Sequence, residues 1–436
     1  MRFLKPHWML AAAVAIPVTG YASTEDAVVF DGEGASLVDY LRFAQSANPQ
    51  LAAFDQRYQA ATQRIPQASA LPEPMFQITS FVESVQTRTG PQENVFMFSQ
   101  KIPWFGKLGS REEVASAQAE ALWYAYQTQQ LSVARQLSLA FFEYAYTKEA
   151  IRLTKENRDL LNTLEPVVQA KVEGGADLNG LLRLKVEIGR VDDQLQSLSQ
   201  RRIAQSSQIA KLLGVTDPAL LPWPAWSPPE VIELDGVSLV GAIKANNPEL
   251  EMLRRKINSA EARREIANLE RYPDFSLGVN YVQIGDPGTS VADAGKDAWG
   301  VTFAVNIPIW FEKYSSARAE ALASQRASEN ELTNRFNELR ADLSASMALM
   351  NDTHRRLKLY GEELLSLAKQ AVENSRTSYE AGRTGILEVI DSERSLLELQ
   401  LLYWRAAADA WQQRIIVQTL TNQPLMGTFQ ATQEHE

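Results

Sequence analysis

The sequence predicts a mainly α-helical protein with β-strands, in which long coiled-coil helices accompany four strands per chain. Three observations support this fold class. The 436-residue chain repeats one order of elements, first from Asn48-Pro49 and again from Asn247-Pro248. Each copy holds a pair of segments in which apolar and polar residues alternate, as in strands. Long stretches rich in helix-forming residues and poor in proline follow each pair.

The repeat indicates an internal duplication, because a period this long exceeds that of a short solenoid unit. It divides the chain into a first structural repeat over residues 23–213 and a second over residues 237–423. Residues 214–236 contain five prolines and form a Pro-rich linker between the copies. Residues 424–436 form a C-terminal tail, and residues 1–22 precede the first repeat.

Residues 1–22 have the pattern of a secretory signal peptide. Arg2 and Lys5 precede an apolar run from Trp8 to Val18, and small residues flank the cleavage position after Ala22. An uncleaved membrane anchor is the alternative, but the run is short for a membrane span. The sequence therefore predicts an exported protein.

Charge and composition restrict the possible functions. Removing Arg2 and Lys5 from the 43 basic residues leaves 41 against 53 acidic residues, a net charge of −12. This balance argues against nucleic-acid binding and is compatible with cation traffic, although an acidic coat that aids solubility explains it equally well. The chain has no cysteine. A disulfide framework, thiolate metal sites and lipidation of an N-terminal cysteine are therefore excluded.

Catalytic and cofactor motifs are missing from the sequence. Of the three histidines, His7 lies in the signal peptide, His435 in the tail, and His354 alone in a helical stretch. With so few histidines, the sequence gives no reason to expect a metal site, a cofactor or an enzymatic activity. The sequence also lacks a Gly-rich phosphate loop, a Gly-x-Ser-x-Gly elbow and a His-Glu-x-x-His run.

The proline-free stretches predict very long helices. Residues 309–423 contain no proline, and an arm of 65 residues would extend roughly 100 Å. Apolar residues recur in the first copy with gaps of 3 and 4, the spacing of a coiled coil. Ordinary amphipathic helices of a soluble bundle would give the same spacing but do not explain the length. The first-copy seam is Leu181, Leu184, Ile188, Val191, Leu195 and Leu198. The second-copy stripe is Ile386, Ile390, Leu397, Trp404, Ala408, Trp411 and Ile415, with Glu393 interrupting it.

The alternating segments are typical of strands with one lipid-facing side. Apolar residues on one face and small or polar residues on the other suit a transmembrane barrel with a wet lumen. A half-buried sheet of a soluble protein would show the same period. The second copy has Phe275, Leu277, Val279 and Tyr281, then Trp299, Val301, Phe303, Val305 and Ile307. The first copy has Phe76, Ile78 and Val82, then Phe96, Phe98 and Ile102.

Loops and aromatic pairs favour the membrane interpretation. Polar loops are expected over Thr87–Glu93 and Gly285–Asp297. Aromatic residues follow the second strand of each pair, as in an interfacial aromatic belt. They are Trp104, Phe105, Trp310 and Phe311.

Four strands cannot close a barrel, and an open edge in lipid leaves backbone groups unpaired. The sequence therefore predicts an oligomer. Two chains would supply 8 strands and a filled barrel, whereas three would supply 12 strands and room for a channel.

One segment carries a specific family resemblance. Tyr379-Glu380-Ala381-Gly382-Arg383-Thr384-Gly385-Ile386-Leu387-Glu388-Val389-Ile390-Asp391 resembles the closed periplasmic end of TolC-family outer-membrane channels. The resemblance covers nearly all of the mature chain and implies a homotrimer. It implies that Glu388 and Asp391 form acidic rings at the pore constriction, and that Tyr379 latches the closed end. Solvated faces of a surface helix are the plainer interpretation of the two acids. The acidic partner of that tyrosine in the family falls at Leu181 here, so another contact must hold the end shut.

Two further motifs resemble the heavy-metal branch of the family, the CzcC and CusC type. They are Ile102-Pro103-Trp104-Phe105-Gly106-Lys107-Leu108-Gly109 and Ile307-Pro308-Ile309-Trp310-Phe311. Many members of that branch are lipidated on a cysteine, which this chain lacks.

The resemblance implies a passive conduit that exports heavy-metal cations and works with a periplasmic adaptor and a proton-driven inner-membrane pump of the RND type. Its barrel would lie in the lipid of a Gram-negative outer membrane and its helices in the periplasm. Turns at Gly174, Gly175, Gly382 and Gly385 would be the helix tips that the adaptor contacts. A drug or protein-secretion channel of the same family, and a soluble periplasmic coiled-coil scaffold, are the alternatives.

Overall fold

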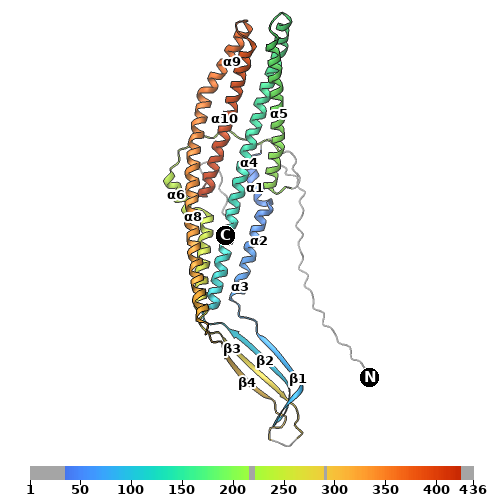
Figure 1. Cartoon of the computed structure of the whole chain (residues 1–436), viewed down its shortest axis with the longest axis vertical. Helices are drawn as coiled ribbons and strands as arrows, with labels where there is room; N and C mark the ends of the chain where they lie inside the picture. The colour runs from blue at the N-terminus through green and yellow to red at the C-terminus, as the bar shows by residue number, and fades with distance from the viewer. Residues whose placement is uncertain (1–34, 216–220, 289–291, 424–436) are drawn as a thin grey trace, which may run out of the picture.

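The computed structural model describes residues 35–215, 221–288 and 292–423. The molecule is elongated, with helices over most of its length and a small sheet at one end (Figure 1). Within the described ranges, no helix combines the length and the hydrophobicity that a membrane crossing requires. The predicted signal peptide and C-terminal tail lie outside the described residues.

Both halves of the chain have the same order of elements: short helices, two strands, then long helices. The mainly helical fold with a small antiparallel sheet is thus confirmed, whereas the duplication itself stays a prediction. The first half contains α1 (Leu37–Ala47), α2 (Pro49–Thr62), α3 (Arg64–Ser69), β1 (Met75–Thr87), β2 (Gly90–Ile102), α4 (Lys107–Glu173) and α5 (Leu178–Leu213). The second half contains α6 (Gly236–Asn246), α7 (Pro248–Leu269), β3 (Phe275–Ile284), β4 (Ala298–Val305), α8 (Phe311–Lys358), η1 (Leu359–Leu364), α9 (Leu365–Glu380) and α10 (Ile386–Thr421).

The two Asn-Pro pairs have equivalent structural roles. Each asparagine caps a helix that begins with the following proline, because its Oδ1 accepts backbone N–H groups of the first turn. Each also donates its Nδ2 to the end of the last helix of its own half. Asn48 donates to the carbonyl of Leu212 at 2.7 Å, and Asn247 to that of Leu420 at 2.9 Å. In each half, the same short motif therefore links the start of an early helix to the end of the last helix.

The helices are as long as the sequence predicts, with one interruption. Helix α4 has 67 residues and continues through Pro166 near its end, which corresponds to about 100 Å of length. In the second half the long arm is divided, because six residues of π-helix, Leu359–Leu364, separate α8 from α9. A π-turn adds a residue to the helical repeat, and the helix continues beyond it.

The four strands form one antiparallel sheet in the order β1-β2-β3-β4, so the two halves meet at the β2–β3 pair. Cross-strand partners share a face of a sheet, and the register places on one face those predicted apolar residues that have a cross-strand partner. One row across the sheet is Phe76, Phe98, Val279 and Val301, and the next is Ile78, Phe96, Tyr281 and Trp299. The opposite face carries rows such as Gln77, Met97, Asn280 and Gly300.

The predicted loop between the first two strands is wrong. A polar loop was expected over Thr87–Glu93, but β1 extends to Thr87 and β2 begins at Gly90. Gly90 has a φ of 138°, which favours glycine, and it lies too close to the backbone of Gly285 for any side chain. The long predicted loop Gly285–Asp297 does connect β3 and β4.

The described residues of the linker between the halves pack against the long helices. Trp223 stacks on Tyr144 of α4 with ring centroids 4.9 Å apart, and Arg202 of α5 lies 3.9 Å from the Trp223 ring centroid. Trp411 of α10 donates its indole N–H to the carbonyl of Ser227 at 2.8 Å. The linker therefore contacts helices of both halves near the middle of the molecule.

The helix seams differ from the sequence prediction at two acidic positions. In α5 the buried line runs through Leu184, Glu187 and Val191, and Ile188 is only half-buried. In α10, Glu393 was expected to interrupt the apolar stripe, but it is buried within that stripe with only 4% of its surface exposed. Both carboxylates are thus part of the interior of the helical region.

Candidate functional site

The helical end farthest from the sheet is made of two turns, one between α4 and α5 and the other between α9 and α10 (Figure 1). Both turns use a glycine in the left-handed region, Gly175 with φ 101° and Gly382 with φ 71°. Gly174 caps α4, and Gly385 immediately precedes α10. The four glycines predicted for the tips therefore lie where the chain reverses direction.

An apolar cluster joins the two hairpins behind these turns. It contains Leu161 and Val168 of α4, Leu181, Leu184 and Val191 of α5, Tyr379 of α9, and Ile386, Val389 and Ile390 of α10. Burial of these side chains is the main non-polar attraction between the hairpins at this end.

Tyr379 belongs to this cluster and contacts a lysine. The Lys171 Nζ lies 3.8 Å from the centroid of the Tyr379 ring, a cation–π contact, and donates to the Tyr379 carbonyl at 3.1 Å. Burial raises the pKa of the Tyr379 hydroxyl, so the ring stays neutral. Leu181, at the position of the family's acidic partner, belongs to the same apolar cluster. In the described residues, Tyr379 thus contacts Lys171 of α4 rather than an acidic residue.

Glu388 and Asp391 lie on the exposed side of the first turns of α10. Their spacing of three residues puts both on one side of the helix, while Val389 and Ile390 between them are buried in the apolar cluster. The Asp391 side chain is 73% exposed. The two carboxylates thus point away from the body of their own chain.

An ion pair between a buried carboxylate and a half-exposed arginine, which the sequence did not reveal, bridges the hairpins one turn further along. Glu187 of α5 accepts two hydrogen bonds from Arg394 of α10, at 2.6 Å from Nη2 and 3.2 Å from Nε. The Glu187 side chain is only 9% exposed. The same guanidinium lies 3.6 Å from Asp391. The seam read from the sequence ran through Ile188 rather than Glu187, so no local signal marked this pair.

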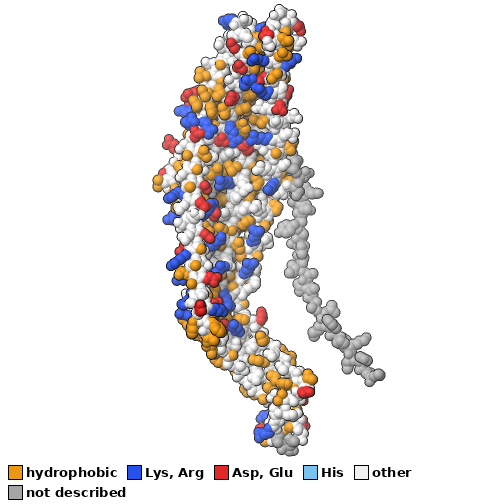
Figure 2. Space-filling view, in the orientation of Figure 1, with side chains coloured by type: hydrophobic (Ala, Val, Ile, Leu, Met, Phe, Trp, Pro, Cys, Tyr) orange, Lys and Arg blue, Asp and Glu red, His pale blue; other side chains and the backbone are white. Residues whose placement is uncertain are grey.

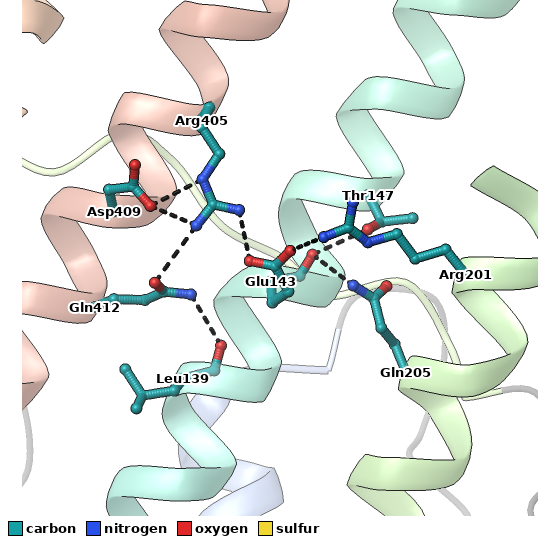
Figure 3. Close-up of polar contacts among 8 residues, drawn as sticks. All are labelled: Leu139, Glu143, Thr147, Arg201, Gln205, Arg405, Asp409 and Gln412. Atoms are coloured by element: carbon teal, nitrogen blue, oxygen red, sulfur yellow. Dashed lines mark hydrogen bonds and ion pairs between the residues drawn. The ribbon is translucent and has the colours of Figure 1, made fainter. Parts of the chain in front are cut away.

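A second polar network ties three helices together at mid-height (Figure 3). Glu143 of α4 binds Arg201 of α5 at 2.5 Å and Arg405 of α10 at 2.6 Å. Arg405 also binds Asp409 of its own helix, and its guanidinium lies 5.0 Å from the Tyr146 ring centroid. Gln412 donates to the Leu139 carbonyl at 3.2 Å. The two hairpins are therefore held by charge both near the tip and at mid-height.

The predicted aromatic belt lies where the sheet meets the helices. Figure 2 shows hydrophobic side chains gathered at this junction and over the sheet. Phe105, Trp310 and Phe311 are exposed by 78%, 69% and 79%. Trp104 differs, because its ring stacks on Tyr272 with centroids 5.1 Å apart.

The junction itself is fixed by Asp274, which precedes β3. Its Oδ1 accepts from the Lys107 Nζ at 2.7 Å and from the Trp104 backbone N–H at 3.0 Å, and its Oδ2 lies 3.2 Å from Lys101. Partial burial opposes ionisation, but these partners outweigh it and hold the pKa of Asp274 below its usual range.

The described residues give no grouping of acidic or histidine side chains suited to a bound metal. His354 is buried on α8, and its pKa is lowered by that burial and by the positive charge of Arg414. The imidazole is therefore neutral at physiological pH.

Comparison with known proteins adds a family and a set of related folds. Residues 239–423 match the family described as outer membrane efflux protein. The chain is 23% identical over 430 residues to the cobalt-zinc-cadmium resistance protein CzcC of Cupriavidus metallidurans, covering 94% of each.

Solved structures share the whole architecture. One of CusC has a TM-score of 0.76 at 15% identity and covers 97% of this chain and all of the other, 100%. The outer membrane protein VceC of Vibrio cholerae has a TM-score of 0.73 at 17% identity, covering 89% of this chain and 96% of the other. The resemblance predicted from the sequence is thereby confirmed.

Proposed function

We propose that three copies of this chain, whose residues 239–423 match the outer membrane efflux protein family, form a passive conduit across the outer membrane and the periplasm. The strands would cross the outer membrane of a Gram-negative cell, and the helices would extend into the periplasm. The conduit has no enzymatic role in this proposal and takes its energy from a partner.

The apolar face of the sheet carries this proposal. Its side chains are strongly exposed, with Phe76 at 62%, Trp299 at 75%, Val301 at 69% and Phe303 at 64%. Such a continuous apolar surface in water would be costly, because each buried Å² of it is worth about 25 cal/mol. Lipid is the environment that would bury it while leaving the small and polar face toward a lumen.

Trimer formation follows from the sheet edges. Among the described residues of one chain, β1 and β4 each have a neighbouring strand on one side only. An edge in lipid leaves N–H and C=O groups unpaired, so β4 of one copy would pair with β1 of the next. Three copies supply 12 strands, which leaves room for a channel.

We place the narrowest point of the conduit at Glu388 and Asp391. Both side chains are exposed on α10 and lie outside the apolar cluster that covers the opposite side of this helix. One copy of each carboxylate from three subunits would make two rings near the axis, which attract cations and repel anions. Tyr379 with Lys171 would help to keep the helices closed around these rings.

The pore and its rings are tested by conductance of the purified protein in planar bilayers. We expect wild-type trimers to conduct and to prefer cations, and Glu388→Ala with Asp391→Ala to reduce the cation-to-anion permeability ratio about twofold or more. Glu398→Ala, an exposed acid further along α10, serves as the control. Unchanged selectivity in the double variant would remove the role of the rings.

For the cargo we propose heavy-metal cations. The support is the similarity to CzcC along 94% of both chains, together with the junction motifs of that branch. A periplasmic adaptor would contact the turns around Gly174, Gly175, Gly382 and Gly385, and a proton-driven inner-membrane pump of the RND type would drive transport.

Deletion of the gene in its own host tests the cargo. We expect reduced tolerance to at least one of copper, zinc, cobalt, cadmium and nickel, restored by the wild-type gene and not by a Glu388→Ala, Asp391→Ala variant that still forms trimers. Unchanged metal tolerance with increased sensitivity to drugs would instead assign the conduit to drug efflux.

A further inference from the structure

We propose that Arg394 sets the charge of the pore according to whether the helical end is closed: Glu187 of the neighbouring hairpin holds Arg394 in the closed form, and its release lets Arg394 neutralise Asp391. This inference rests on the proposed function, since it assumes that Asp391 faces a pore. It makes Arg394 a selectivity-determining residue, although it does not itself line the predicted ring.

The first step is that the Arg394 guanidinium binds Glu187 more strongly than it binds Asp391. Arg394 makes a two-pronged contact with Glu187, at 2.6 Å and 3.2 Å, whereas Asp391 lies 3.6 Å from Nη1. The Glu187 side chain is 9% exposed and the Asp391 side chain 73%. A two-pronged, shielded contact is much stronger than a long, solvated one. In this structure Asp391 therefore keeps most of its negative field.

The second step is the environment of Glu187. Its carboxylate lies in the buried line of α5 between Leu184 and Val191. Arg190 of the same helix approaches it at 3.4 Å, but the Arg190 side chain is 64% exposed. A buried carboxylate that loses its main partner is strongly destabilised. Glu187 therefore binds Arg394 as long as α10 stays against α5.

The third step is the fate of Arg394 when the hairpins separate. α5 and α10 meet here along a groove of about 360 Å³, and Glu187 and Arg394 supply the ion pair across it. If α10 moves away, Arg394 remains on the same helix as Asp391, three residues away, which is a favourable spacing for an ion pair. Each subunit would then place a guanidinium against its own ring carboxylate. Separation of the hairpins thus widens the constriction and also lowers its negative charge.

The test uses two substitutions that break the same bridge and have different effects on the ring. Glu187→Gln frees Arg394 to pair with Asp391, so we expect the cation-to-anion permeability ratio to fall roughly two- to threefold. Arg394→Gln breaks the bridge but leaves no guanidinium to neutralise Asp391, so the ratio should stay close to the wild-type value. Both variants should increase conductance, because both weaken the contact between the hairpins. The measurement is the reversal potential of purified trimers in planar bilayers under a KCl gradient.

A matched control is the ion pair between Lys185 and Glu165, which joins α4 and α5 within one hairpin at 3.2 Å. Lys185→Gln should leave selectivity and conductance as in the wild type. Arg394→Lys keeps the positive charge but not the two-pronged contact with Glu187, so it should raise conductance and lower the cation-to-anion permeability ratio, as Glu187→Gln does. It also serves as the second variant should a glutamine substitution prevent trimer formation.

The outcomes separate this inference from the proposed function. A wild-type protein that forms no ion-conducting pore would contradict the proposed function and this inference with it. A conducting wild type in which Glu187→Gln and Arg394→Gln lower the ratio equally, or in which Glu187→Gln lowers it by no more than Lys185→Gln, would overturn the inference and leave the conduit intact.

Discussion

Glu393 is a carboxylate that the fold buries at an energetic cost. It lies in the apolar stripe of α10 with 4% of its surface exposed, and its Oε1 has no hydrogen-bond partner in the described part of the chain. Burial raises its pKa above the ordinary value of 4.5, and the positive charge of Arg376 opposes this only in part. The folded chain therefore favours the protonated form of this side chain.

This raised pKa predicts a definite dependence of stability on pH. Between 4.5 and the raised value, the folded chain binds more protons than the unfolded chain. The free energy of unfolding therefore falls as pH rises through this window, and the cost is fully present above it. Glu393→Gln removes the ionisable group. We expect it to stabilise the protein at pH 7.5 by about 1–3 kcal/mol, the cost of an unsatisfied buried polar group.

Thermal unfolding of trimers in detergent, followed by circular dichroism at pH 7.5 and pH 4, measures this effect. The stabilisation by Glu393→Gln should shrink toward zero at pH 4, where the wild-type side chain is protonated as well. Glu398→Gln, an exposed acid on the same helix, should shift the unfolding temperature at neither pH. A stabilisation of equal size at both pH values would contradict the role of ionisation.

Sequence reasoning identified the residues of the tip but not the contacts that hold it. The glycine turns and the exposed acids of α10 follow from local signals: glycine at helix ends and acid spacing along one helix. The Glu187–Arg394 pair joins residues 207 positions apart, and the Tyr379–Lys171 contact joins residues 208 positions apart. No local pattern encodes such pairs, because they depend on which helices become neighbours.

At the scale of elements, the spacing of apolar residues and the positions of proline and glycine predicted the helices and strands well. The exceptions have physical causes. The helices α4, α5 and α10 match long stretches with few breakers. The first hairpin is tighter than expected, because Gly90, Pro91 and Gln92 still pair with β1, and Gln92 also pairs with β3. The π-turn over Leu359–Leu364 has no sequence signature, since a single inserted residue in a helix is stabilised by packing rather than by composition.

At the scale of the whole molecule, polar groups are placed according to two different environments. The helical region carries ion pairs within and between hairpins, such as Glu143 with Arg201 of the same hairpin and with Arg405 of the other. The sheet presents a face of aromatic and branched apolar side chains, and at its base Asp274 and its lysines anchor it to the helices. An aqueous environment suits the first region and lipid suits the apolar face of the second. This division agrees with a conduit that is part periplasmic and part embedded.

Neighbouring residues on β4 provide a sharp test of which face meets lipid. Val301 lies on the apolar face, opposite Val279, and Thr302 lies on the other face, opposite Gly278. If the apolar face meets lipid, Val301→Arg places a charge in hydrocarbon and should destabilise the embedded trimer by about 2–4 kcal/mol. Thr302→Arg places the same charge in the lumen, where it stays hydrated. It should leave the trimer intact and lower the cation-to-anion permeability ratio.

The measurement compares the fraction of membrane-extracted trimer with that of wild type by size-exclusion chromatography, followed by conductance of the trimers recovered. Val301→Ala, which shortens the side chain without adding charge, controls for loss of packing at the same position. Equal trimer yields for Val301→Arg and Thr302→Arg would mean that the two faces have similar surroundings. The sheet would then belong to a water-filled or globular environment on both sides, and the conduit would lose its membrane-spanning wall.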